Sequence, residues 1–163
     1  MNLRSVITWL FAISLAIVDQ GLQAESVKLK IQTKECTKGV LKHPVKVSVA
    51  VFDAEEISSI VELALSYERS ASRISEDGAD KAEAKYVELR RRAISSHALA
   101  RSKHLSAPAI EFDIPPVRQV VVFGFGETES DFRYARRVRD IMQGRANEVV
   151  LNFSKDEECT NAK

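Results

Sequence analysis

The spacing of apolar residues changes twice along this chain, and the two changes limit the folds that it can adopt. Residues 27–52 alternate apolar and polar side chains, which is the period-2 pattern of half-buried strands. From Asp53 to about residue 106 the apolar residues recur every three to four positions, as in an amphipathic helix. From residue 109 the strand pattern returns. Strands therefore flank one helical block, and the absence of a repeated strand–helix–strand unit argues against a doubly wound parallel sheet.

The helical block, about residues 54–106, is predicted to form two antiparallel helices. Asp53 and Glu56 have the spacing of a capping box, which predicts a helix start at Asp53. Residues 75–78 end the first helix, and the second is expected to end before Pro108. The two predicted apolar stripes are Ile57, Ile60, Val61, Ala64, Tyr67, Ala71 and Ile74, and then Ala82, Tyr86, Leu89, Ala93 and Ala100, with Val87, Ile94 and Ala98 beside the second.

Four segments after the helical block bear on the strand count. Residues 110–114 and 148–153 are predicted strands, and the continuous apolar run at 119–124 predicts a strand buried on both faces. Residues 132–142 fit either a helix or a strand by periodicity. The short connections on both sides of this segment favour the strand.

These patterns predict a mainly β protein with an α insertion. The expected architecture is an antiparallel β-sandwich of six or seven strands, interrupted by an αα-hairpin. It occupies a single domain, residues 25–163, with a flexible tail at about 155–163.

Residues 1–24 are predicted to be a signal peptide rather than part of the fold. The apolar run of residues 6–18 covers only about 20 Å of helix, which is less than the ~30 Å hydrocarbon core of a bilayer. Cleavage near Ala24 would export residues 25–163 to the periplasm or the exterior, with no membrane span in the mature chain. An uncleaved N-terminal anchor is the alternative.

The formal charge of +1 argues against binding nucleic acid through bulk charge.

The two cysteines lie near the ends of the predicted mature chain. Cys36 lies close to the N-terminus of the predicted mature chain and Cys159 lies close to its C-terminus. In an oxidising compartment they are therefore candidates for a disulfide that joins the two ends. The alternative is two free or intermolecular thiols, because sequence alone does not show that their Cα atoms lie close enough to bond.

Several strand and turn motifs together resemble a known family. Residues 36–40 and 43–53 resemble the "G-x-V … P-V … A-x-V-x-V" opening of carboxypeptidase-regulatory-like and transthyretin-like domains, and residues 112–122 resemble their "F-x-L-P-P-G-x-Y-x-V-x-V" strand pair. Residues 148–153 resemble the closing strand. The resemblance implies a transthyretin-like (prealbumin-like) sandwich that serves as a non-catalytic accessory module. Val117 stands where that family has a turn glycine, and the helical hairpin replaces a short loop.

Residues able to carry catalysis or hold a cofactor are sparse. His97 and His104 are predicted to lie about 10 Å apart on one helix, too far apart to share a metal ion, and His43 is predicted to be a turn residue. Residues 124–127 predict a turn at a strand end rather than a phosphate-binding loop. The sequence therefore predicts no cofactor, no metal and no catalytic group.

Arginines form two clusters that stand out from the nearly neutral net charge. They are a candidate surface for an acidic partner, anionic lipid head groups or a nucleic acid. The nearly neutral net charge favours the alternative, a solvated face offset by nearby acidic residues, namely Glu83, Glu88, Asp131 and Asp140. The candidate interaction residues are Arg90, Arg91, Arg92, Arg101, Arg133, Arg136, Arg137 and Arg139.

The functional hypothesis is an exported, non-catalytic module that binds a protein partner, with the helical hairpin as the interaction surface. One alternative is an exported hydrolase with a dispersed site, for which His97 or His43 would be essential. Another is a carrier of a small apolar ligand inside the sandwich.

Overall fold

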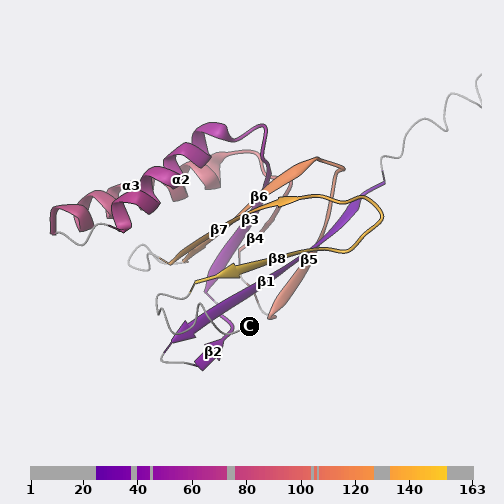
Figure 1. Ribbon diagram of the computed structural model, residues 1–163, viewed down its shortest axis with the longest axis horizontal. Coiled ribbons are helices and arrows are strands. Elements are labelled where there is room, and N and C mark those ends of the chain that lie inside the picture. Colours follow the sequence, from indigo (N-terminus) through magenta and orange to yellow (C-terminus); the bar gives the residue numbers. More distant parts are fainter. Residues whose placement is uncertain are drawn as a thin grey trace, which may run out of the picture.

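The computed structural model describes residues 25–37, 40–44, 46–72, 76–103, 105, 107–126 and 133–153, which form three layers (Figure 1). Helices α2 (Ser58–Ala71) and α3 (Glu76–Ser95) cover one face of a four-stranded sheet. The other face of that sheet packs on a second four-stranded sheet. The predicted mainly β fold with a helical insertion is confirmed.

The first sheet is built around β1 (Val27–Thr37), which pairs with β2 (Val40–Lys42), β5 (Ala109–Ile114) and β8 (Asn147–Asn152). The pairs with β2 and β5 are antiparallel, but β1 and β8 run parallel. The prediction of a purely antiparallel sandwich is therefore wrong at this pair. Alternation of apolar residues shows that a segment is a strand, but it carries no information on the direction of a partner that lies far away in the sequence.

The second sheet has the order β4-β3-β6-β7 and is antiparallel throughout. Its strands are β3 (Val47–Asp53), β4 (Ala100–Ser102), β6 (Gln119–Gly126) and β7 (Tyr134–Asp140). Strand β7 confirms the strand interpretation of the ambiguous segment 132–142.

Alternate residues of both sheets fill the space between them. Leu29, Val49 and Leu151 are fully buried in this cluster. A close approach at Gly124 completes it, because a Cβ there would lie 2.5 Å from Cζ of Phe153. Glycine at this position lets the Phe153 ring lie directly against the backbone of β6.

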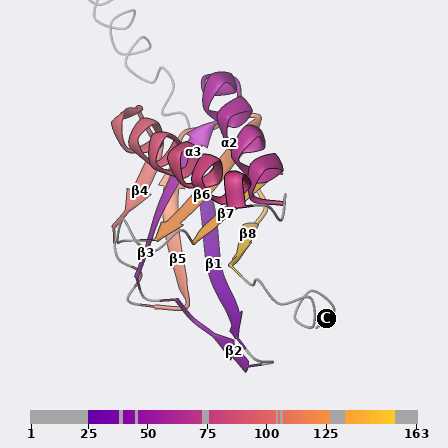
Figure 2. The ribbon, with the colours of Figure 1, turned by 90° about the vertical axis from the view of Figure 1, so that its left-hand side faces the viewer.

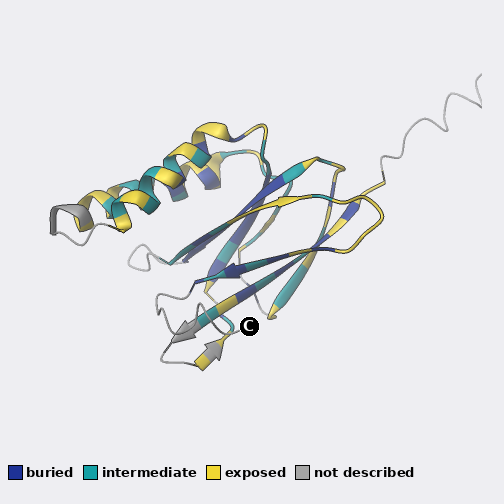
Figure 3. Ribbon diagram, in the orientation of Figure 1, coloured by how far each residue is buried: buried dark blue, intermediate teal, exposed yellow. Residues whose placement is uncertain are grey.

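The helical hairpin packs on the outer face of the second sheet, with both helices in front of its strands in Figure 2. Phe52 of β3 and Phe123 of β6 are buried against Ala64 of α2 and Leu89 of α3. Since β6 is also covered by the first sheet, its predicted burial on both faces is confirmed. The outer side of the hairpin is exposed (Figure 3).

Both ends of the helical block differ from the prediction. Strand β3 continues to Asp53, whose side chain accepts a hydrogen bond from the Glu55 N–H (3.0 Å), and the N-cap of α2 is Ile57, which makes no side-chain cap. The predicted capping box at Asp53 is therefore wrong, because pairing of Asp53 with Val120 holds its backbone in the sheet. Helix α3 ends at Ser95 rather than near residue 106.

The segment after α3 forms β4, although the sequence pattern predicts Ala100 on the helical stripe. Residues 100–102 pair with residues 49–51 of β3 and so cover part of an open sheet edge. A strand of three residues is too short to change the spacing of apolar residues in the sequence, so the helical pattern extends over β4 and the prediction there is wrong.

Candidate functional site

The structure separates the arginines proposed as one interaction surface into two groups. One group holds elements of the fold together, and the other faces solvent. The contacts of each arginine decide its group.

Arg136 joins the edge strand β7 to the helical hairpin. Its Nε and Nη2 atoms donate to Oε1 and Oε2 of Glu68 on α2, at 2.9 and 3.0 Å. The Tyr134 hydroxyl, on the same face of β7, donates to Glu68 Oε1 at 3.0 Å. Tyr67 stacks edge-on against Tyr134 with ring centroids 5.2 Å apart. Arg136 is therefore a structural residue.

The protonation states in this cluster follow from its contacts. Burial raises the pKa of Glu68, but the hydrogen bonds and positive charge of Arg136, with the Tyr134 hydrogen bond, outweigh it and hold the pKa below its ordinary value. Burial, the Glu68 charge and the hydrogen bond to it raise the pKa of Tyr134. Glu68 is thus an anion that accepts three hydrogen bonds at neutral pH.

Arg133 and Arg101 also act within the fold. Arg133 Nη1 lies 3.0 Å from Glu35 Oε2, an ion pair that joins the start of β7 to β1 in the other sheet. The Arg133 carbonyl accepts a hydrogen bond from the hydroxyl of Tyr86 on α3 at 3.2 Å. The Arg101 guanidinium donates to the carbonyls of residues 93, 94 and 96 at 3.1, 2.6 and 2.9 Å. It thereby caps the C-terminus of α3, where a positive charge is favourable.

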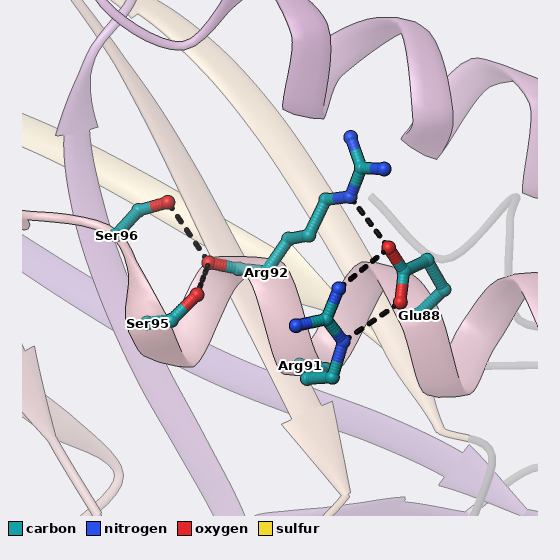
Figure 4. A network of polar contacts seen from close by, with 5 residues as sticks. All are labelled: Glu88, Arg91, Arg92, Ser95 and Ser96. Atoms are coloured by element: carbon teal, nitrogen blue, oxygen red, sulfur yellow. Dashed lines mark hydrogen bonds and ion pairs between the residues drawn. The ribbon is translucent and has the colours of Figure 1, made fainter.

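Arg91 and Arg92 share one carboxylate on the exposed side of α3 (Figure 4). Arg91 donates to both oxygens of Glu88 at 2.8 and 2.9 Å, and Arg92 Nε donates to Oε1 at 2.6 Å. The hydrogen bonds from Arg91 and Arg92 lower the pKa of Glu88 to about 2. This side of α3 is therefore an exposed charge cluster in which one carboxylate offsets part of the positive charge, as the acidic-residue alternative predicted for Glu88. Arg90 of the same helix is half-buried.

Arg137 and Arg139 differ from the other arginines. Both are exposed on β7, and neither forms an ion pair with any residue that the structure describes. By strand alternation they share a face with buried Ala135, while exposed Val138 lies on the face of Tyr134. These two arginines remain candidates for contact with a partner.

The backbone of β7 has no strand partner among the described residues on the side away from β6. The Gly126 N–H donates to the Arg133 carbonyl at 2.9 Å, and the Ile141 N–H donates to the Arg118 carbonyl at 2.9 Å. With the register of the pair, these two bonds mean that odd-numbered residues of β7 bond to β6. Residues 134, 136, 138 and 140 direct their N–H and C=O groups outward, where no described strand pairs with them.

The candidate catalytic groups are not brought together. Nδ1 of His43 lies 2.8 Å from Oγ1 of buried Thr33, whereas His97 is exposed after α3. His104 lies outside the described residues. Among the residues that are described, no three His, Cys, Asp or Glu side chains are grouped as metal ligands. The turn predicted to start at Gly124 is wrong, because Gly124 and Gly126 both lie within β6.

Other predicted features fall outside the described parts of the chain. These are the signal peptide, the tail, Cys159, Asp131 and the Cys36 side chain, although the Cys36 backbone lies in β1. The disulfide therefore stays a prediction. Among the described helices, none is long and apolar enough to cross a membrane.

The sequence did not predict two polar contacts, those of Glu68 with Arg136 and of the Tyr86 hydroxyl with the Arg133 carbonyl. Each helical residue is a polar group beside or within an apolar helical stripe, and its partner comes from a distant strand.

Comparison with family models, with curated proteins and with solved structures finds no match to this chain.

Proposed function

We propose that this chain is an exported, non-catalytic protein-interaction module that binds an extended acidic segment of its partner along β7. The observation that carries the proposal is the outer edge of β7, which pairs with no described strand and is flanked by two exposed arginines. A segment bound there would add a fifth strand to the second sheet, a common mode of peptide recognition.

The open edge supplies affinity through the backbone. Residues 134, 136, 138 and 140 offer alternating donors and acceptors to a neighbouring strand. The edge is also held in place before binding, because Glu68 fixes Arg136 to α2 and Glu35 fixes Arg133 to β1. A strand that is already ordered loses little conformational entropy on binding, which favours affinity.

The side chains beside the edge favour one kind of partner. In an added antiparallel strand, Arg137 and Arg139 would occupy the non-hydrogen-bonded positions, where facing side chains come closest. Acidic residues opposite them form ion pairs, and an apolar residue between them contacts exposed Val138. The expected partner motif therefore alternates acidic, apolar and acidic residues.

A second copy of this chain is a poorer occupant of the same edge. Antiparallel pairing of two β7 strands about Val138 would place Arg137 of each copy opposite Arg139 of the other. Like charges directly opposite one another destabilise a strand pair. The charge pattern thus favours a different, acidic protein over self-association.

The finer fold assignment and the location belong to the same proposal. Support for a transthyretin-like sandwich comes from the positions of the motifs that resemble that family, which fall on β1–β3, β5, β6 and β8 of the two sheets. Export rests on the apolar character of residues 6–18. Mass spectrometry of protein purified from the native host tests export, since a mature chain would begin at Glu25.

The test of partner binding is a selection of displayed short peptides on the purified protein and on two Val138 variants. Val138→Pro removes an N–H that points away from β6, so no bond within the sheet is lost. Val138→Thr keeps that N–H and the β-branched shape, and it is the matched control. We expect selected peptides to alternate acidic and apolar residues and to bind Val138→Pro about tenfold more weakly than Val138→Thr.

Two outcomes would overturn the proposal. One is equal binding of the selected peptides to Val138→Pro and to the wild type. The other is selection of peptides without acidic enrichment. Circular dichroism and Tm confirm that each variant is folded. If Val138→Pro does not fold, reversal of charge in the double variant Arg137→Glu, Arg139→Glu decides, because selection must then switch from acidic to basic peptides.

A further inference from the structure

A cavity of about 230 Å³ lies beside the C-terminal half of α3, over β3 and β4. It is on the helix-covered face of the second sheet, near the edge opposite β7, so it is separate from the proposed partner edge. Its floor and walls carry two kinds of side chain. One kind is cationic, and the other is apolar.

The cationic side chains around the cavity are Arg90, Arg101 and Lys103, and no carboxylate lines it among the residues that the structure describes. Arg101 is held in place by its three hydrogen bonds to the end of α3. These bonds use three of the five guanidinium N–H groups, so two donors remain for a ligand. Lys103 is exposed and forms no ion pair with any described residue.

The apolar part of the cavity is formed by residues from three elements. Ala50 of β3, Ala93 of α3 and Phe125 of β6 are buried, and Ile94 stands at the rim with 55% of its surface exposed. An exposed isoleucine beside a concave apolar surface gains by being covered. Ser48 adds one hydroxyl group to the lining.

We propose that this cavity binds a small organic carboxylate with an apolar body. The carboxylate would lie against Arg101 and Lys103, since charge-assisted hydrogen bonds to a guanidinium are strong and directional. The apolar body would lie against Phe125 and Ile94. An inorganic anion would contact only the cationic side chains, and a neutral apolar molecule would contact only Phe125 and Ile94.

The test is a calorimetric and NMR titration of the purified protein with three probes: benzoate, benzyl alcohol and inorganic phosphate. Benzoate is expected to saturate and to shift the amide signals of β3, β4 and the end of α3. Benzyl alcohol has the same body without the charge, and phosphate has charge without the body. We expect each of these two probes to bind at least about tenfold more weakly than benzoate.

Two variants place the binding in this cavity. Ser48→Leu would fill it, so benzoate binding should disappear while Tm is unchanged or higher. Lys103→Met should weaken benzoate about fivefold, whereas Lys34→Met, on the outer face of the first sheet, should not. Equal affinity for benzoate and benzyl alcohol, absence of saturation, or unchanged binding in Ser48→Leu would overturn the proposal.

Discussion

Two arginine–glutamate pairs of nearly equal geometry should differ sharply in their effect on stability. Arg136 contacts Glu68 through two hydrogen bonds of 2.9 and 3.0 Å, and Arg91 contacts Glu88 through two of 2.8 and 2.9 Å. The difference lies in burial, because the side chain of Arg136 is 18% exposed and that of Arg91 is 66% exposed. Replacing each arginine by methionine therefore separates the effect of geometry from that of burial.

The expected cost of Arg136→Met follows from the groups that it leaves behind. Hydrogen bonds to charged groups contribute about 1.5–3 kcal/mol each when they are buried. Glu68 is 36% exposed, so water partly replaces the lost contacts, and the loss in free energy of unfolding should be about 2 kcal/mol. At about 0.3 kcal/mol per kelvin for a chain of this size, Tm should fall by roughly 7 °C. Arg91→Met should leave Tm unchanged, because water and Arg92 both solvate Glu88.

The assay is urea unfolding followed by circular dichroism, supported by calorimetric Tm, for both single variants. Glu68→Gln and the double variant Glu68→Gln, Arg136→Met complete a double-mutant cycle, in which we expect a coupling energy of about 1–2 kcal/mol. Equal losses for Arg136→Met and Arg91→Met would refute the assignment of Arg136 to the fold. So would a coupling energy of zero.

Three further predictions concern the packing, the pH dependence and the helix end. Gly124→Ala should lower the free energy of unfolding by about 1–3 kcal/mol, because Cζ of Phe153 must move away by about 0.9 Å, from 2.5 Å to the 3.4 Å of an ordinary contact. In urea unfolding, Phe153→Leu in the same chain should recover part of this loss. The folded-state pKa of Glu68 lies below its ordinary value of 4.5, so its contribution to the free energy of unfolding is present above about pH 4.5 and is lost as pH falls through the lowered pKa. In a plot of Tm against pH, Glu68→Gln should therefore reduce the fall of Tm at acid pH. Arg101→Met should cost about 1 kcal/mol and speed amide exchange at residues 93–96, whereas unchanged exchange would contradict its capping role.

Most of the fold could be predicted from the sequence because it depends on local periodicity. The alternation of Val47, Val49 and Val51 places a strand without any knowledge of its neighbours. The errors arise where a distant partner outweighs a local signal. Asp53 has a capping-box neighbour at position 56, yet its pairing with Val120 keeps it in β3. The parallel β1–β8 pair and the short β4 depend in the same way on strands far away in the chain.

The sequence predicted the candidate arginines as a group, but it could not show which of them are structural and which are free to contact a partner. Arg136 and Arg137 are adjacent, and only the position of Glu68, 68 residues away, makes the first structural. Arg133 likewise depends on Glu35, which is 98 residues away. A single sequence carries no signal for such pairs, whereas Glu88 with Arg91 and Arg92 is visible at helical spacing of three and four residues.

Under the proposed function, the two exposed arginines of β7 would keep an unpaired strand edge available without causing aggregation. A free edge is a template for pairing with any extended chain, and charged side chains beside it are one way to prevent self-pairing. Arg137 and Arg139 would repel a second β7, yet the same charges would attract an acidic strand. Neutralising both residues should therefore have two linked effects: weaker binding of acidic peptides and a greater tendency of the protein to self-associate. If these arginines guarded the edge without contributing to partner recognition, the double variant Arg137→Thr, Arg139→Thr would self-associate but would bind acidic peptides as tightly as the wild type.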